Sequence, residues 1–266
     1  MGDPDRPARR EPELLALADP ADRSTAPAAV SVMLLGHFAV ERDGVDASSP
    51  PGRPATLVKL LALQGTVTVD EAIDLPWPEA DIDIGRARLR NLLNRVRTAS
   101  GEIVGRRDGA LTLAPGVAVD AQRFEEEAAA ALAAPPEARP GLARGALARS
   151  TGELLPADRY ADWATVPRER LRRRHLALLD LVAEEAIARG DLEEADRLLD
   201  TAISTDPLEE QRYVRLARAM FAQGRARRAR RLAAQGVAVA EDLGVEPGEE
   251  PGEELSALLA QLADHP

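Results

Sequence analysis

Residues 85–100 carry apolar and polar positions with the period of an α-helix. Apolar side chains stand at i, i+3, i+4 and i+7, a spacing that places them on one helix face: Leu89, Leu92, Leu93 and Val96. The opposite face combines short polar side chains with arginines, and the stretch contains no acidic residue. An amphipathic helix with such an unbalanced basic face is typical of a surface that contacts a polyanion.

We therefore interpret this stretch as a DNA-recognition helix. Short polar side chains can reach base edges in the major groove, and arginines can hold phosphates or guanine. The alternative is a solvated helix in a chain that uses arginine freely, since Lys59 is the only lysine among 34 basic residues. The side chains expected to contact DNA from this helix are Arg86, Arg88, Arg90, Asn91, Asn94, Arg95 and Thr98. Within this set the two asparagines are assigned to base edges and the arginines to phosphates or guanine.

Strand and helix patterns precede this helix. Near-alternation of apolar residues over 31–44 predicts a strand pair or meander. Residues 55–64 predict a helix of about three turns. Thr68, with Glu71 three residues later in the capping-box position, predicts the start of a second, short helix. Pro76 is expected to end that helix.

A short hairpin is predicted after the arginine-rich helix. Residues 103–113 read as two strands around a turn at Asp108 and Gly109. The order strands, helix, helix, arginine-rich helix, hairpin is that of a winged helix-turn-helix. In that fold the third helix enters the major groove while the hairpin reaches the neighbouring backbone. Arg106 and Arg107 are accordingly assigned to phosphates beside the wing.

From residue 119 onward the pattern is helical. Helices are predicted over 120–133 and 138–150, and a long helix is predicted from about 167 to 189. The expected fold class is therefore mostly α with a small β component.

An internal repeat lies in this helical half. Residues 186–195 align with residues 220–229 at a spacing of 34, a period typical of tetratricopeptide repeats. The alignment matches two glycines and two alanines: Gly190 with Gly224, and Ala195 with Ala229. Glycine allows the tight turn and alanine lets paired helices approach closely, so we expect a stacked helical array with a groove.

Other residues of this half are assigned to structure. Tyr160 and Trp163, ahead of the long helix, are interpreted as a local core that packs the array against its first two helices. The basic runs at 168–175 and 225–231 are interpreted as solvated helix faces, although each could meet DNA or an acidic protein surface.

The formal net charge of −11 would argue against nucleic-acid binding if it were spread evenly, but it is distributed unevenly along the chain. Residues 51–118 carry nine basic and eight acidic side chains, whereas residues 119–266 carry 20 and 28. Because charges are screened beyond about 10 Å, local charge decides phosphate contact. The overall acidity therefore does not exclude DNA.

Several site classes are excluded or unsupported. The chain has no cysteine, which excludes disulfides and thiolate metal sites. His37, His175 and His265 are scattered, and Lys59 lacks a phosphate-loop context. We expect no catalytic, metal or cofactor site. The lack of a signal sequence or an apolar run long enough for a membrane span predicts a soluble cytoplasmic protein without a membrane partner.

The chain resembles the Streptomyces antibiotic regulatory protein (SARP) family over about residues 31–260. The most specific segment is GELLPADRYADWATVPRERL at 152–171, which looks like the signature of the bacterial transcriptional activator domain. DLGVEP at 242–247 looks like the end of that domain. VMLLGHFAV and IDLPWPEA, followed by the arginine-rich helix, look like the DNA-binding half.

The resemblance implies a transcriptional activator without enzymatic activity. Family members bind direct repeats near promoters as side-by-side protomers, contact RNA polymerase holoenzyme including its sigma subunit, and often control secondary-metabolite clusters. This sequence differs from the family pattern at Pro76, at Gly109 and Ala110 in the wing, and at Asp81 and Asp83 before the arginine-rich helix. The alternative is consequently a protein-interaction scaffold whose winged helix does not read DNA.

The expected organisation has three parts. Residues 1–29 form a disordered tail, residues 30–118 a winged helix-turn-helix domain that binds double-stranded DNA, and residues 119–262 a tetratricopeptide-like activator domain.

Overall fold

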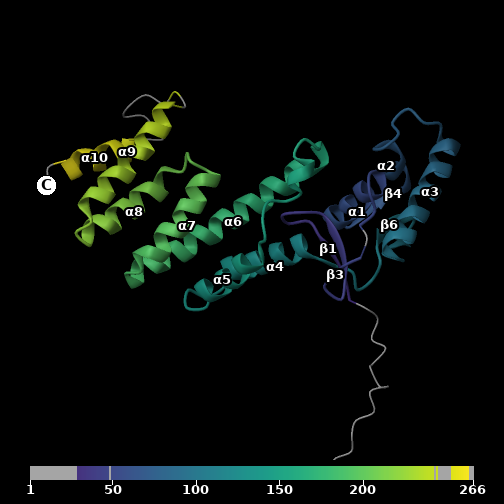
Figure 1. Cartoon of the computed structure of the whole chain (residues 1–266), viewed down its shortest axis with the longest axis horizontal. Coiled ribbons are helices and arrows are strands. Elements are labelled where there is room, and N and C mark those ends of the chain that lie inside the picture. The colour runs from purple at the N-terminus through teal and green to yellow at the C-terminus, as the bar shows by residue number, and fades with distance from the viewer. Residues whose placement is uncertain (1–28, 48, 243, 245–252, 264–266) are drawn as a thin grey trace, which may run out of the picture.

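The computed structural model describes residues 29–47, 49–242, 244 and 253–263. The predicted tail lies outside these residues except for Ala29, as do His265 and part of the DLGVEP motif. In Figure 1 the strands and the first three helices lie at one end of an elongated molecule, and the later helices form an array toward the other end. The expectation of a mostly α fold with a small β component is confirmed.

Two small sheets belong to the first half. The four-stranded sheet has the order β3-β2-β1-β7, with β1 antiparallel to β2 and parallel to β7. Its strands are β1 (Val30–Met33), β2 (Ala39–Arg42), β3 (Val45–Asp46) and β7 (Ala118–Val119). The three-stranded antiparallel sheet has the order β4-β6-β5 and contains the predicted hairpin. Its strands are β4 (Thr66–Thr68), β5 (Val104–Arg107) and β6 (Ala110–Leu113).

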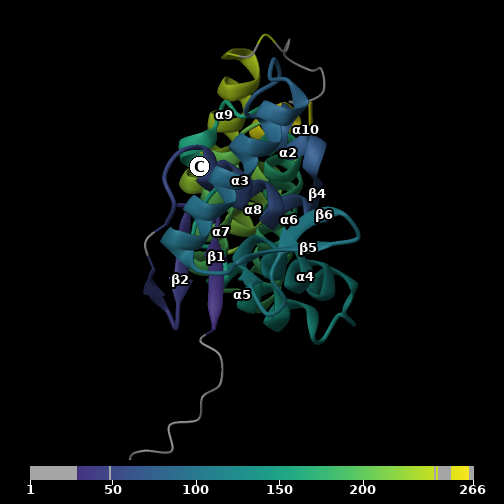
Figure 2. The ribbon, with the colours of Figure 1, turned by 90° about the vertical axis from the view of Figure 1, so that its right-hand side faces the viewer.

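Three helices complete the winged helix-turn-helix. They are α1 (Arg53–Gln64), α2 (Val69–Asp74) and α3 (Ile82–Ser100). The predicted capping box is present at the start of α2: the Thr68 side chain accepts a hydrogen bond from the Glu71 N–H, and a Glu71 carboxylate oxygen accepts one from the Thr68 N–H at 2.8 Å. The helix ends before Pro76, as expected. Figure 2 faces this end of the molecule, where α3 lies beside β5 and β6.

Eight helical segments follow among the residues that the structure describes. They are α4 (Asp120–Ala133), α5 (Arg139–Arg149), the short 3-10 helix η1 (Pro156–Asp158), α6 (Asp162–Arg189), α7 (Leu192–Thr205), α8 (Glu210–Ala222), α9 (Ala226–Asp242) and α10 (Glu253–Ala263). The expected start of the long helix near residue 167 was wrong, because α6 begins at Asp162 and contains Pro167. Proline there removes one helical hydrogen bond close to the helix start, and the longer helix tolerates that loss.

The repeat is confirmed in the turns of the array. Gly190 and Gly224 adopt φ angles of 80° and 76°, in the region that favours glycine, and each turns the chain between two helices. Ala195 and Ala229 are fully buried where the paired helices meet. A second hydrophobic cluster, centred on α7 and α8, fills this part of the array.

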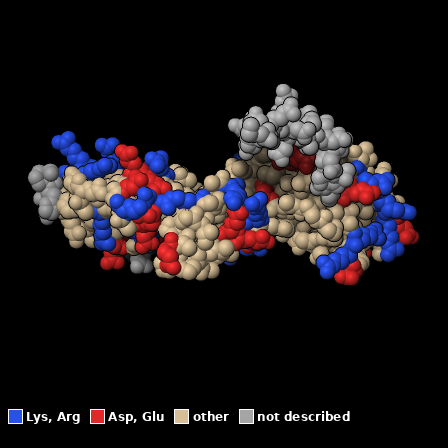
Figure 3. All heavy atoms as spheres, turned by 90° about the horizontal axis from the view of Figure 1, so that it is seen from below, with Lys and Arg blue, Asp and Glu red and all other residues tan. Residues whose placement is uncertain are grey.

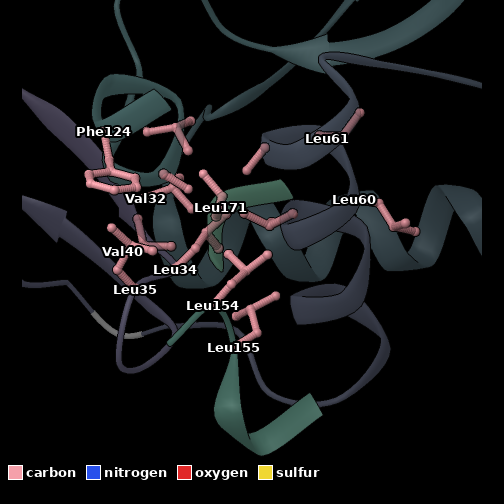
Figure 4. Packing of buried hydrophobic residues seen from close by; sticks show 14 of the residues in the cluster. Val32, Leu34, Leu35, Val40, Leu60, Leu61, Phe124, Leu154, Leu155 and Leu171 are labelled. Atoms are coloured by element: carbon pink, nitrogen blue, oxygen red, sulfur yellow. The ribbon is translucent and has the colours of Figure 1, made fainter. Parts of the chain in front are cut away.

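The first hydrophobic cluster contains residues from both sides of the predicted domain boundary at residue 118. It joins Val32 and Leu34 of the β1 region to Phe124 of α4 and Leu171 of α6, as Figure 4 shows. Because one core serves both parts, the division of the chain at residue 118 stays a prediction.

The segment 151–158 is hydrogen-bonded to the end of β1. The Leu155 N–H donates to the Leu34 carbonyl at 2.9 Å, and the Gly36 N–H donates to the Glu153 carbonyl at 2.8 Å. Lys59 of α1 forms an ion pair with Asp158 at 2.6 Å, and the Lys59 side chain is only 10% exposed. The most specific motif of the resemblance therefore packs the helical array against the winged helix.

Two interpretations of this region were wrong in part. Trp163 does pack against the first core, but Tyr160 is 88% exposed. In the run at 168–175, Arg168 is not solvated, since its guanidinium donates to three backbone carbonyls. The carbonyls that accept from Arg168 are those of Leu154, Asp158 and Arg159, so this side chain ties the segment before α6 to the helix. In the other run the side chains of Arg225, Arg227 and Arg231 are exposed, as expected.

Candidate nucleic-acid interface

Helix α3 presents its basic face to solvent. Leu89, Leu92 and Val96 are at most 4% exposed and fix the helix on the core. All seven side chains predicted to contact DNA from α3 are exposed: Arg86, Arg88, Arg90, Asn91, Asn94, Arg95 and Thr98. The structure therefore brings these predicted residues together on one accessible helix.

The β5–β6 hairpin is the wing of the winged helix-turn-helix. A groove of about 690 Å³ lies between α3 and this hairpin, and we call it the wing groove. Arg90, Asn94, Arg97 and Arg106 are among its lining residues. The Asn94 side-chain oxygen accepts a hydrogen bond from the Arg97 guanidinium at 3.2 Å, which orients the amide. Arg97 was missing from the sequence-based site, although it stands in the same arginine-rich stretch.

A second groove of about 480 Å³ lies between α3 and the start of α1, and we call it the α1 groove. Three arginines line it, Arg53 from α1 and Arg88 and Arg95 from α3. The guanidinium carbons of Arg53 and Arg88 lie 5.4 Å and 5.9 Å from the centre of the Trp77 ring, within the range of cation–π attraction. No acidic residue is among the described residues that line this groove.

Arg53 was not predicted because it does not belong to an arginine-rich stretch. It lies on a different helix from the other arginines, and only the tertiary fold places it beside Trp77. The signal that existed was its position at the start of α1, where the helix dipole adds to its positive charge.

Acidic groups adjoin the basic face at a few points. Asp83 lies in the first turn of α3, where a negative charge is favourable for the helix dipole. Glu102 lines the wing groove. At the wing tip Arg107 pairs with Asp108 at 3.8 Å, but both side chains are more than 80% exposed. An ion pair so exposed contributes little and leaves Arg107 able to reach another partner.

Figure 3 shows the charge distribution on one face of the molecule. Basic atoms gather at the end that carries α3, and basic and acidic atoms are interspersed over the helical array.

Comparison with known families matches the helical half. The family model described as the bacterial transcriptional activator domain covers residues 119–261, more than half of the chain. The chain belongs to this family. The expected relationship to SARP-type transcriptional activators is thereby confirmed, and the family is one of transcriptional regulators.

A solved structure extends the likeness across the first half. The structure titled Mycobacterium tuberculosis EmbR in complex with low affinity phosphopeptide matches 89% of this chain with a TM-score of 0.70 and 20% sequence identity. This chain covers 65% of that protein. At this identity the match shows a shared fold, which includes the winged helix-turn-helix and the helical array. The chain has no match among the curated proteins.

Among the helices that the structure describes, none combines the length and apolar character needed to cross a membrane.

Proposed function

We propose that this protein is a sequence-specific DNA-binding activator that reads promoter direct repeats through α3 and the wing. The observation that carries the proposal is the exposed basic face of α3, bounded by two arginine-lined grooves, in a chain of an activator-domain family. The exposed asparagines Asn91 and Asn94 contact base edges. The arginines of α3 and Arg106 and Arg107 of the wing contact phosphates or guanine.

The acidic remainder of the chain favours one orientation on DNA. The net charge is −11, and residues 119–266 carry most of the acidic excess. Phosphates repel such a surface and attract the α3 end, so the array is held away from the duplex. From there it is available to contact RNA polymerase holoenzyme, including sigma, and to lie beside a second protomer on the next repeat. We place this activity at promoters such as those of secondary-metabolite clusters, with no catalytic step.

Selection of bound fragments from genomic DNA by the full chain, at two salt concentrations, tests the proposal. We expect enrichment of a repeated motif that persists at the higher concentration. Binding that disappears at moderate salt without any enriched motif would instead support a protein-interaction scaffold, because purely electrostatic contact with DNA is sequence-independent and salt-sensitive.

Replacing Asn94 by alanine is expected to relax sequence preference at one base position by about 1 to 3 kcal/mol, since a bidentate amide–base contact is lost. Measured affinities for a panel of single-base variants of the selected site give this value. The companion change Arg106→Ala should weaken all members of the panel alike. If Asn94→Ala weakened binding to all members of the panel equally, this side chain would contact the DNA backbone and not a base.

Replacing Arg53 by glutamine is expected to weaken binding to every DNA sequence equally, because the α1 groove would lose one phosphate contact. The slope of log affinity against log salt should become less steep by about 0.9. A salt titration with the selected fragment measures the change. Arg227→Gln is the matched control, since Arg227 is an exposed arginine on α9. If both variants behave alike, the α1 groove takes no part in DNA binding.

A further inference from the structure

A cavity of about 390 Å³ lies where the end of β1 meets the helical array. Its volume falls within the range of small-molecule sites, about 300 to 1,000 Å³. The apolar part of its lining consists of four buried side chains, which Figure 4 shows close together: Leu35, Phe124, Leu154 and Leu171. These residues come from the β1 end, α4, the segment 151–158 and α6.

One polar atom in this lining has no hydrogen-bond partner among the described residues. The Nδ1 atom of His175 is buried and makes no hydrogen bond within the part of the chain that the structure describes. Its ring lies 6.2 Å from the ring of Phe124. Burial lowers the pKa of His175, so the imidazole is neutral near pH 7 and offers one donor and one acceptor. Buried polar atoms in proteins almost always have a partner, so an unpaired one beside a cavity indicates a missing polar group.

Two arginines, Arg168 and Arg172, also line the cavity, as does one acidic residue, Glu153. Arg172 uses three N–H donors, two toward Glu169 at 2.9 Å and 3.2 Å and one toward the Thr205 carbonyl at 3.3 Å. Arg168 donates to the backbone carbonyls of residues 154, 158 and 159, and its guanidinium lies 3.4 Å from the carboxylate of Glu153. A guanidinium has five N–H donors, so each arginine can donate further hydrogen bonds. Guanidinium groups bind carboxylates through such paired donors.

We propose that this cavity binds a small organic acid with a flat apolar body and a single carboxylate. The apolar body lies against Phe124 and the leucines, the carboxylate accepts hydrogen bonds from Arg172 and Arg168, and a polar atom of the ligand pairs with His175. The proposal does not depend on DNA binding, because no lining residue of the cavity belongs to α3 and its occupancy is measured without DNA.

Nuclear magnetic resonance of the full chain with 1-naphthoate as the probe tests the proposal. The chain has three histidines, so their ring C–H signals can be followed individually. We expect a saturable shift of the His175 signal and none of the His37 signal. The neutral analogue 1-naphthalenemethanol should bind at least about tenfold more weakly, because it lacks the carboxylate.

Two neighbouring arginines provide a matched pair of variants. Arg172→Gln is expected to weaken naphthoate binding about tenfold, since a charge-assisted hydrogen bond is lost. Arg173→Gln removes the same charge from a side chain that is 70% exposed and does not line the cavity, and it should change affinity less than about twofold. Calorimetric titration of a third variant, His175→Phe, gives an independent measurement, with an expected loss of about fivefold or more.

Three results would overturn the proposal. The first is the absence of a saturable shift at His175 with naphthoate. The second is equal binding of the acid and the neutral analogue. The third is an equal effect of Arg172→Gln and Arg173→Gln in variants whose thermal melting shows that they are folded.

Discussion

Replacing Phe124 by alanine is expected to lower the free energy of unfolding by about 3 to 4 kcal/mol. The ring is 2% exposed and lies in the cluster that joins β1, α4 and α6, so its removal leaves a cavity that no single element can close. Phe124→Leu keeps most of the apolar volume and should cost less than half as much.

Urea denaturation followed by two signals measures this effect. Tryptophan fluorescence reports on Trp77 and Trp163, which pack against the first cluster, and circular dichroism reports on all helices. Because α6 runs through both clusters, we expect both midpoints to fall together in Phe124→Ala. A shift of the fluorescence midpoint alone would mean that the winged helix and the array unfold independently.

Replacing Arg212 by alanine is expected to destabilise the protein by about 2 to 3 kcal/mol. The Arg212 residue is 4% exposed, and its guanidinium donates to both carboxylate oxygens of Asp180, at 2.9 Å and 3.1 Å. It also donates to the backbone carbonyl of Asp206 at 3.0 Å. Removing one member of a buried ion pair leaves the other charge uncompensated, at a cost of about 3 to 5 kcal/mol when both are fully buried. The carboxylate of Asp206 also lies 3.3 Å from the guanidinium. The side chains of Asp180 and Asp206 are 25% and 31% exposed, which reduces the cost.

A double variant separates the cost of the unpaired charge from the value of the ion pair. Arg212→Met combined with Asp180→Leu replaces the pair by apolar groups and should recover more than half of the stability that Arg212→Met alone loses. Urea midpoints for the single and double variants provide the comparison. A loss below about 0.5 kcal/mol in Arg212→Ala would contradict the structural role given to this network.

Features determined by neighbours in the sequence were predicted correctly. The Thr68 and Glu71 capping box, the apolar stripe of α3 and the glycine turns of the repeat depend on residues a few positions apart, or on a repeated pattern. Each follows from hydrogen-bond geometry or helical period, which the sequence displays directly.

Features formed between distant segments were missed. The β1 end contacts residues 151–158, and Arg53 meets Trp77, only because the chain folds back on itself. Arg168 was assigned to a solvated face because its neighbours are basic. Its guanidinium instead donates hydrogen bonds to three backbone carbonyls of residues 154–159. Local charge patterns predict where arginines are, but only tertiary structure determines which partners they have. The DNA-contacting roles of the α3 residues stay predictions.

The burial of Lys59 makes its reactivity a measure of contact between the winged helix and the helical array. Lys59 is the only lysine, so the N-terminal amine and this side chain are the only primary amines of the chain. In the folded protein Lys59 is 8% exposed and its ammonium group is held by Asp158, so amine-directed reagents should acylate it slowly. The mass of the peptide that contains Lys59, followed over time, would then report how often the winged helix and the helical array separate.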